Sequence, residues 1–167
     1  MTRRLWYPQL DIYDCVRRMS ALLSHTTKGM YQERLYILDF YLANPPLLHR
    51  TSMKSDVRSR FRSLRIEKPE KAFVAYPAAQ LLFHQMEPIQ KDGLGAMAGK
   101  GLISIKELKN RNIKFTENGK QVFDAGLHEH VTEEEKALTI FLVNSFGKEG
   151  DEGMRSLRAG TGLRRAN

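Results

Sequence analysis

The sequence predicts a mostly helical α+β fold in which helices precede a two-stranded hairpin. Residues 77–85 and 88–100 read as consecutive helices, with Pro88 at a helix start, where proline is tolerated. The apolar run 102–105 and the alternating residues 113–115 are typical of strands, and the charged segment 106–112 between them is typical of a turn. Together with a scaffold helix before them, these elements form the outline of a winged-helix domain: three helices and a β-hairpin wing.

An N-terminal helical extension is expected before this domain. Residues 11–24 carry apolar side chains on one helix face and arginines on the other, and Asp11 can cap the helix start. Trp6 lies in the preceding arm, where it packs either onto the core of the protein or onto a partner.

Residues 30–43 form the most apolar predicted helix. Leu38 and Tyr41 belong to apolar side chains that surround it almost completely, which is typical of a central core helix or of a subunit interface. The following Asn44-Pro45-Pro46 ends the helix, because a residue before proline avoids helical angles. This helix would be the first scaffold helix of the winged helix.

Residues 49–71 are the most basic region. Arg58, Arg62 and Arg65 share one face of a predicted helix, and apolar residues occupy the opposite face. This arginine face is either solvated or suited to nucleic-acid phosphates, which guanidinium groups bind well.

The predicted recognition helix, 88–100, lacks a run of residues that read base edges. Its glycines and alanines, Gly95 among them, instead allow another backbone to approach closely, so we expect a protein interface here. The wing is the stronger candidate for nucleic-acid contact, through phosphates only, although its cations also suit a solvated hairpin. These cations are Lys106, Lys109, Arg111 and Lys114.

The C-terminal part begins with a helix predicted over 131–146. Thr132 followed three residues later by Glu135 is a capping-box pattern, and the apolar body of the helix suits core closure or dimerisation. Residues 147–167 read as a flexible, basic, glycine-rich tail. We therefore expect one domain over 1–146, with its winged-helix portion at roughly 30–125.

Composition limits the classes of protein that fit. The net charge of +8 favours a polyanion or an acidic partner, and 41% hydrophobic residues fit a globular chain. The single cysteine, Cys15, excludes an internal disulfide, and neither a membrane-spanning segment nor a signal peptide is recognisable. We expect a soluble cytoplasmic protein.

No pattern of a catalytic centre is recognisable. The glycine-rich stretch 93–101 ends in Lys-Gly, where a phosphate-binding loop needs Ser or Thr after the lysine. His128 and His130 are neighbours without a further metal ligand at suitable spacing. The sequence predicts a protein that is not an enzyme and uses no cofactor or metal.

Three segments resemble a known family. They are W-Y-P-Q-L-D-I-Y-D-C-V-R-R-M at 6–19, E-R-L-Y-I-L-D-F-Y-L-A-N-P-P-L-L at 33–48 and F-T-E-N-G-K at 115–120. They are similar to the middle component of bacterial ABC-three-component systems, the Lamassu type of antiphage defence. The resemblance implies an accessory subunit between an SMC-like ATPase and an effector, often a nuclease.

Two functions are therefore compatible with the sequence. The first is a non-catalytic subunit that bridges the ATPase and the effector and touches the DNA backbone without sequence specificity. The alternative is a free-standing winged-helix DNA-binding transcriptional regulator, as a homodimer. Genes for an ATPase and an effector beside this one would favour the first.

Overall fold

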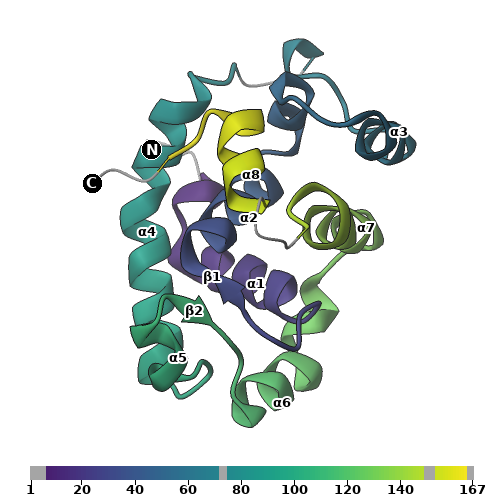
Figure 1. Ribbon diagram of the computed structural model, residues 1–167. Coiled ribbons are helices and arrows are strands. Elements are labelled where there is room, and N and C mark those ends of the chain that lie inside the picture. Colours follow the sequence, from purple (N-terminus) through teal and green to yellow (C-terminus); the bar gives the residue numbers. More distant parts are fainter. Residues whose placement is uncertain (1–6, 72–74, 149–152, 165–167) are drawn as a thin grey trace, which may run out of the picture.

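Helices dominate the computed structural model of the protein (Figure 1), which describes residues 7–71, 75–148 and 153–164. In chain order the elements are η1 (Pro8–Leu10), α1 (Ile12–Leu23), β1 (Met30–Tyr31), α2 (Gln32–Ala43), η2 (Pro45–Arg50), α3 (Ser55–Ser63), η3 (Pro69–Lys71), α4 (Ala79–Gly99), α5 (Ile105–Lys109), β2 (Asn112–Ile113), α6 (Glu117–Ala125), η4 (Leu127–His130), α7 (Glu133–Phe141), the π-helical η5 (Leu142–Phe146) and α8 (Gly153–Thr161). The predicted mostly helical α+β class is confirmed.

Helix α2 is the centre of the hydrophobic core. Every residue from Glu33 to Leu42 is buried, and α1, α4 and α7 all pack against the helix. An apolar surface on all sides of a helix needs neighbours on all sides, and this arrangement supplies them (Figure 1). The helix stops at Ala43, before the predicted Asn44-Pro45-Pro46 break.

Helix α1 confirms the predicted amphipathic extension. The Asp11 carboxylate accepts a hydrogen bond from the Asp14 backbone N–H at 2.9 Å and so caps the helix. Its buried face, with Cys15 and Met19, packs against α4. A Cβ on Gly93 would lie 3.4 Å from Cys15 Sγ, so a glycine of α4 permits close helix packing within this chain.

The two helices predicted at 77–85 and 88–100 are one continuous helix, α4. Pro88 lies in its interior, where a proline removes one backbone hydrogen bond. Buried residues on both sides of the proline, including Phe83, Met86, Leu94 and Met97, hold the two halves in line. Tertiary packing therefore overrides the local signal for a break.

The predicted hairpin is present at its base and differs at its tip. Ile103 pairs with Phe115 in an antiparallel bridge, and the Thr116 N–H donates to Leu102 O at 3.0 Å. The expected turn at 106–112 instead contains α5, because the Ser104 hydroxyl accepts from the Glu107 N–H at 3.3 Å and starts a helical turn. The second strand also pairs with β1, in the register Met30↔Ile113 and Tyr31↔Asn112.

The chain after residue 146 differs from the predicted flexible tail. Helix α8 packs on the core through Leu157, and Leu163 is buried beyond the helix end. Both side chains join the same hydrophobic cluster as α1, α2 and α4. The domain therefore extends past the predicted boundary at 146, while the helix predicted over 131–146 corresponds to α7 and η5.

Candidate functional site

The predicted arginine face lies on and just beyond α3. Arg58 is half-buried, and its guanidinium donates to Thr51 O at 2.6 Å, which gives it a structural role. Arg62 and Arg65 are exposed, and Arg65 follows the helix end with a left-handed φ of 54°. Two of the three arginines therefore present their cations to solvent.

The cations predicted for the wing lie around α5 and β2. Lys106, Lys109 and Arg111 are exposed, whereas Lys114 is half-buried. Arg111 has a φ of 57°, and its carbonyl accepts from the Gln32 N–H at 2.8 Å. The charges thus stand on a folded helical turn that is tied to the start of α2.

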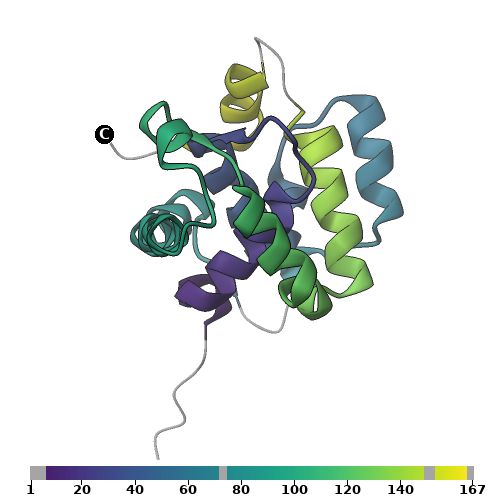
Figure 2. The same ribbon diagram turned by 90° about the horizontal axis from the view of Figure 1, so that it is seen from below.

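These two basic surfaces do not merge. Helix α3 and helix α5 lie at opposite ends of the molecule in both views (Figures 1 and 2). A single short stretch of nucleic acid on one face would therefore meet one surface or the other.

The predicted interface residues lie in different environments. Trp6 is outside the described residues. Leu38 and Tyr41 are 0% and 1% exposed, so in this structure both belong to the protein's own core and offer no surface to a partner. Gly95 is exposed with open space around it, whereas the close approach on α4 occurs at Gly93.

A buried polar network centres on Asp39. The Arg18 Nε donates to Asp39 Oδ1 at 2.7 Å, and the Gln90 amide donates to Asp39 Oδ2 at 2.9 Å. Burial lowers the pKa of the Arg18 guanidinium, and the Asp39 carboxylate raises it. The net change in this pKa is a rise, so Arg18 remains charged. Asp39 is therefore a structural acceptor that ties α1, α2 and α4 together.

The network continues toward the surface. Arg18 also pairs with Asp14 and donates to Pro8 O at 3.1 Å, which fixes η1. Arg17 bridges Asp14 to Glu135 of α7, with 2.6 Å between Arg17 Nη1 and Glu135 Oε1. These contacts leave the carboxylates engaged in holding helices together.

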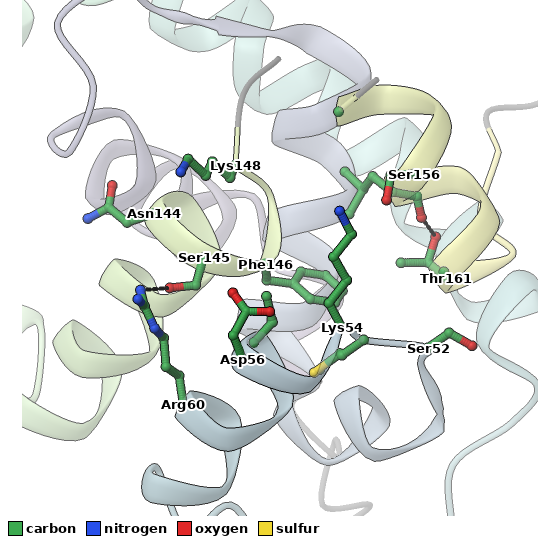
Figure 3. A pocket seen from close by; sticks show the side chains of 15 residues that line it. Ser52, Lys54, Asp56, Arg60, Asn144, Ser145, Phe146, Lys148, Ser156 and Thr161 are labelled. Atoms are coloured by element: carbon green, nitrogen blue, oxygen red, sulfur yellow. Dashed lines mark hydrogen bonds between the residues drawn. The ribbon is translucent and has the colours of Figure 1, made fainter. Parts of the chain in front are cut away.

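A groove with a partly polar lining lies between α3, η5 and α8 (Figure 3) and has a volume of about 540 Å³. Its position depends on how α8 docks. The Ser52 N–H donates to Gly160 O at 2.9 Å, and Arg158 donates to Glu33 Oε1 at 2.8 Å. A Cβ at Gly160 would lie 2.8 Å from Ser52 O, so glycine is needed for this close contact.

The groove has an apolar floor and a polar rim. Met53, Val57, Phe146 and Leu157 supply the floor. The rim carries cations from two segments, Lys54 and Arg60 at the start of and within α3 and Lys148 after η5, and Asp56 is the carboxylate among the described lining residues. Figure 3 shows these side chains around the groove, with Arg60 donating to Ser145 Oγ at 3.2 Å.

Reasoning from the sequence did not predict this groove. Its walls come from residues about 90 positions apart in the chain, and the segment that supplies α8 was expected to be flexible. The π-helical turn η5 follows α7 directly and places both Asn144 and Ser145 on the rim. Such turns are frequent at functional sites, but periodicity does not reveal them.

The described parts of the chain contain neither a candidate metal site nor a candidate membrane span. No group of three or more His, Cys, Asp or Glu side chains there could hold a metal ion. Likewise, none of the helices in those ranges has both the length and the apolar character needed to cross a bilayer.

Comparison with known proteins identifies a family match for this chain. The family described as ABC-three component (ABC-3C) system Middle Component 5 matches residues 4–166, which is almost the entire chain. No curated protein and no solved structure matches.

Proposed function

Because this chain belongs to the ABC-three component system Middle Component 5 family, we propose that it is a non-catalytic accessory subunit of an antiphage defence complex. In this proposal it bridges an SMC-like ATPase and an effector, for which a nuclease is the expected class, as in Lamassu-type systems. The observation that carries the proposal is the family match over residues 4–166.

Exposed apolar side chains near the N-terminus support a role in protein contact. Tyr7 precedes η1 and Leu10 is its last residue, and Tyr13 on the first turn of α1 is 83% exposed. Aromatic residues are enriched at protein interfaces, where they provide large contact areas. This surface replaces Leu38 and Tyr41 as the place where we expect a partner subunit to bind.

The basic surfaces support contact with the DNA backbone. In the proposal, the bridged segments around Ile103 and Phe115 act as a wing, and Lys106, Lys109 and Arg111 face phosphates. Exposed lysines and arginines of this kind give binding that is independent of sequence and sensitive to salt.

Co-purification tests the proposal directly. A tagged full-length chain would be expressed with its neighbouring genes and purified at moderate salt after nuclease treatment, so that nucleic acid cannot hold the proteins together. A large ATPase and an effector should be recovered in fixed ratio with the chain.

Variants then locate the contact. Tyr13→Glu should weaken recovery of a partner. The matched control is Leu81→Glu, which changes an exposed apolar residue on a different helix, α4, and should leave recovery unchanged. A chain recovered alone, which shifts one DNA sequence above competitor, would instead show a free-standing winged-helix regulator.

A further inference from the structure

The groove between α3, η5 and α8 has the size and composition of a ligand site. Its volume of about 540 Å³ falls within the range of small-molecule pockets. We propose that it binds a phosphate group through Lys54, Arg60 and Lys148. The proposal is independent of the accessory-subunit function and involves different residues from the two basic surfaces.

The charge of the lining favours an anion. Among the lining residues that the structure describes, three cationic side chains share the rim with one carboxylate, that of Asp56. Neither Lys54 nor Lys148 makes a side-chain hydrogen bond or an ion pair with another described residue. Their charges are therefore available to a ligand, and lysine binds phosphate as a point charge.

The geometry of the rim favours phosphate over a simple anion. The Arg60 guanidinium is oriented by its bond to Ser145 Oγ, and the remaining N–H groups can bind two oxygens of one phosphate. Asn144, Ser52 and Ser156 add amide and hydroxyl donors to the same lining.

The apolar floor strengthens these interactions. Leu157 is 4% exposed and packs in the core, and Phe146 stacks on Phe141 with 6.1 Å between ring centroids. Charges above such a floor are less screened than charges on an open surface. The floor also offers an apolar contact for a group attached to the phosphate.

The walls are held in place before any ligand binds. The hydrogen bond from the Ser52 N–H to Gly160 O joins the segment before α3 to α8, and the Arg158–Glu33 ion pair joins α8 to α2. Gly153 also lies against Arg34 and Lys148 O, where a Cβ would be 2.5 Å and 2.9 Å from those groups. A preformed groove lowers the entropic cost of binding.

Calorimetry on the full chain tests this site with three phosphate probes: pyrophosphate, ATP with chelator, and a short DNA duplex. The groove variant is the double substitution Lys54→Gln/Lys148→Gln. Its control is Lys91→Gln/Lys136→Gln, which removes two exposed cations of α4 and α7 and therefore has the same net charge as the groove variant. The groove variant should lose affinity by about tenfold or more, and the control by less than about twofold.

The probes separate the two sources of phosphate. Loss of pyrophosphate or ATP binding in the groove variant indicates a free phosphate compound, and loss of duplex binding alone indicates the nucleic-acid backbone. Equal losses in both variants, no binding of any phosphate probe, or tighter binding of a glutamate-rich peptide would overturn the proposal. The single substitution Arg60→Gln, also at an exposed position, is a second test and should likewise lower the affinity for the phosphate probe.

Discussion

The guanidinium of Arg18 lies 2.7 Å from the carboxylate of Asp39, and this ion pair joins α1 to α2 without contact with solvent. The two residues are 21 positions apart, and Gln90 of α4 donates to the same carboxylate. A charge pair in a core needs almost complete hydrogen bonding to offset its loss of hydration. The pair therefore specifies how three helices meet.

Asp39→Ala should lower the free energy of unfolding by about 3–5 kcal/mol, because it leaves the buried Arg18 without its main partner. Urea denaturation followed by circular dichroism measures this change. The control is Glu70→Ala, which breaks the exposed pair with Arg50 at 4.0 Å and should cost less than about 1 kcal/mol. Similar small losses in both variants would show that the buried pair does not stabilise the fold.

Cys15 should resist thiol reagents in the folded protein. Burial and the nearby Asp39 carboxylate raise the pKa of the Cys15 thiol, so the reactive thiolate is suppressed. We expect labelling at pH 8 to be slower than in urea by about a hundredfold or more. Cys15 is the single cysteine of the sequence, so the signal is unambiguous.

The same shift makes stability depend on pH. An unfolded thiol loses its proton near pH 8.5, whereas the folded thiol keeps it, so the unfolded state binds fewer protons above that pH. The free energy of unfolding should therefore fall as pH rises from 8 to 9.5. Cys15→Ala should flatten this decline in urea titrations, and an unchanged slope would contradict the shift.

Helix ends were predictable where a side chain sets them. Asp11 and Thr132 were predicted as caps from local sequence, and each accepts a backbone N–H as expected. The α5 turn carries the same signal, Ser104 followed three residues later by Glu107, which the alternating strand pattern obscured. The continuity of α4 through Pro88 depends on tertiary packing, which no local pattern contains.

The groove could not be predicted for a similar reason. Its cations, Lys54, Arg60 and Lys148, are scattered among many others in a chain of net charge +8. The packing of α3 on η5, where Arg60 donates to Ser145, brings their segments together, and α8 docks beside them through Leu157 and Gly160. Composition favoured a polyanion or an acidic partner, and the fold determines where the charges gather.

Gly119→Ala should destabilise the protein, because its Cβ would lie 2.0 Å from Leu102 O, a backbone atom of the bridged hairpin. We expect a loss of about 1–3 kcal/mol in unfolding free energy. Gly95→Ala is the matched control: no atom lies within 4 Å of that Cβ, and the change should add about 0.5–1 kcal/mol. A neutral Gly119→Ala variant would mean that α6 does not pack against the hairpin as described.

Leu157→Ala tests whether α8 belongs to the folded domain. This side chain is 4% exposed, and its truncation should cost about 2–5 kcal/mol. Leu81→Ala on α4 removes an exposed side chain and should change stability by less than about 0.5 kcal/mol. If both substitutions had the same small effect in thermal unfolding, residues 147–167 would be a tail after all.

The two basic surfaces should contribute separately to DNA affinity if the chain touches the DNA backbone. Lys109→Glu with Arg111→Glu alters the surface at α5, and Arg62→Glu with Arg65→Glu alters the surface at α3. The slope of log affinity against log salt should become shallower by about 1.8 for the surface that is used, since each lost phosphate contact contributes about 0.9. Fluorescence anisotropy with duplex DNA at several salt concentrations measures this slope.

Charge matching makes this comparison decisive. Lys91→Glu with Lys136→Glu changes the net charge by the same amount at exposed positions on α4 and α7, which are other helices than α3 and α5. If Lys109→Glu with Arg111→Glu has the same DNA affinity and the same salt slope as this control, the wing does not contact DNA. Because α3 and α5 lie at opposite ends, a shallower slope in both variants would require DNA long enough to reach both ends, and shortening the duplex should then abolish one of the two effects.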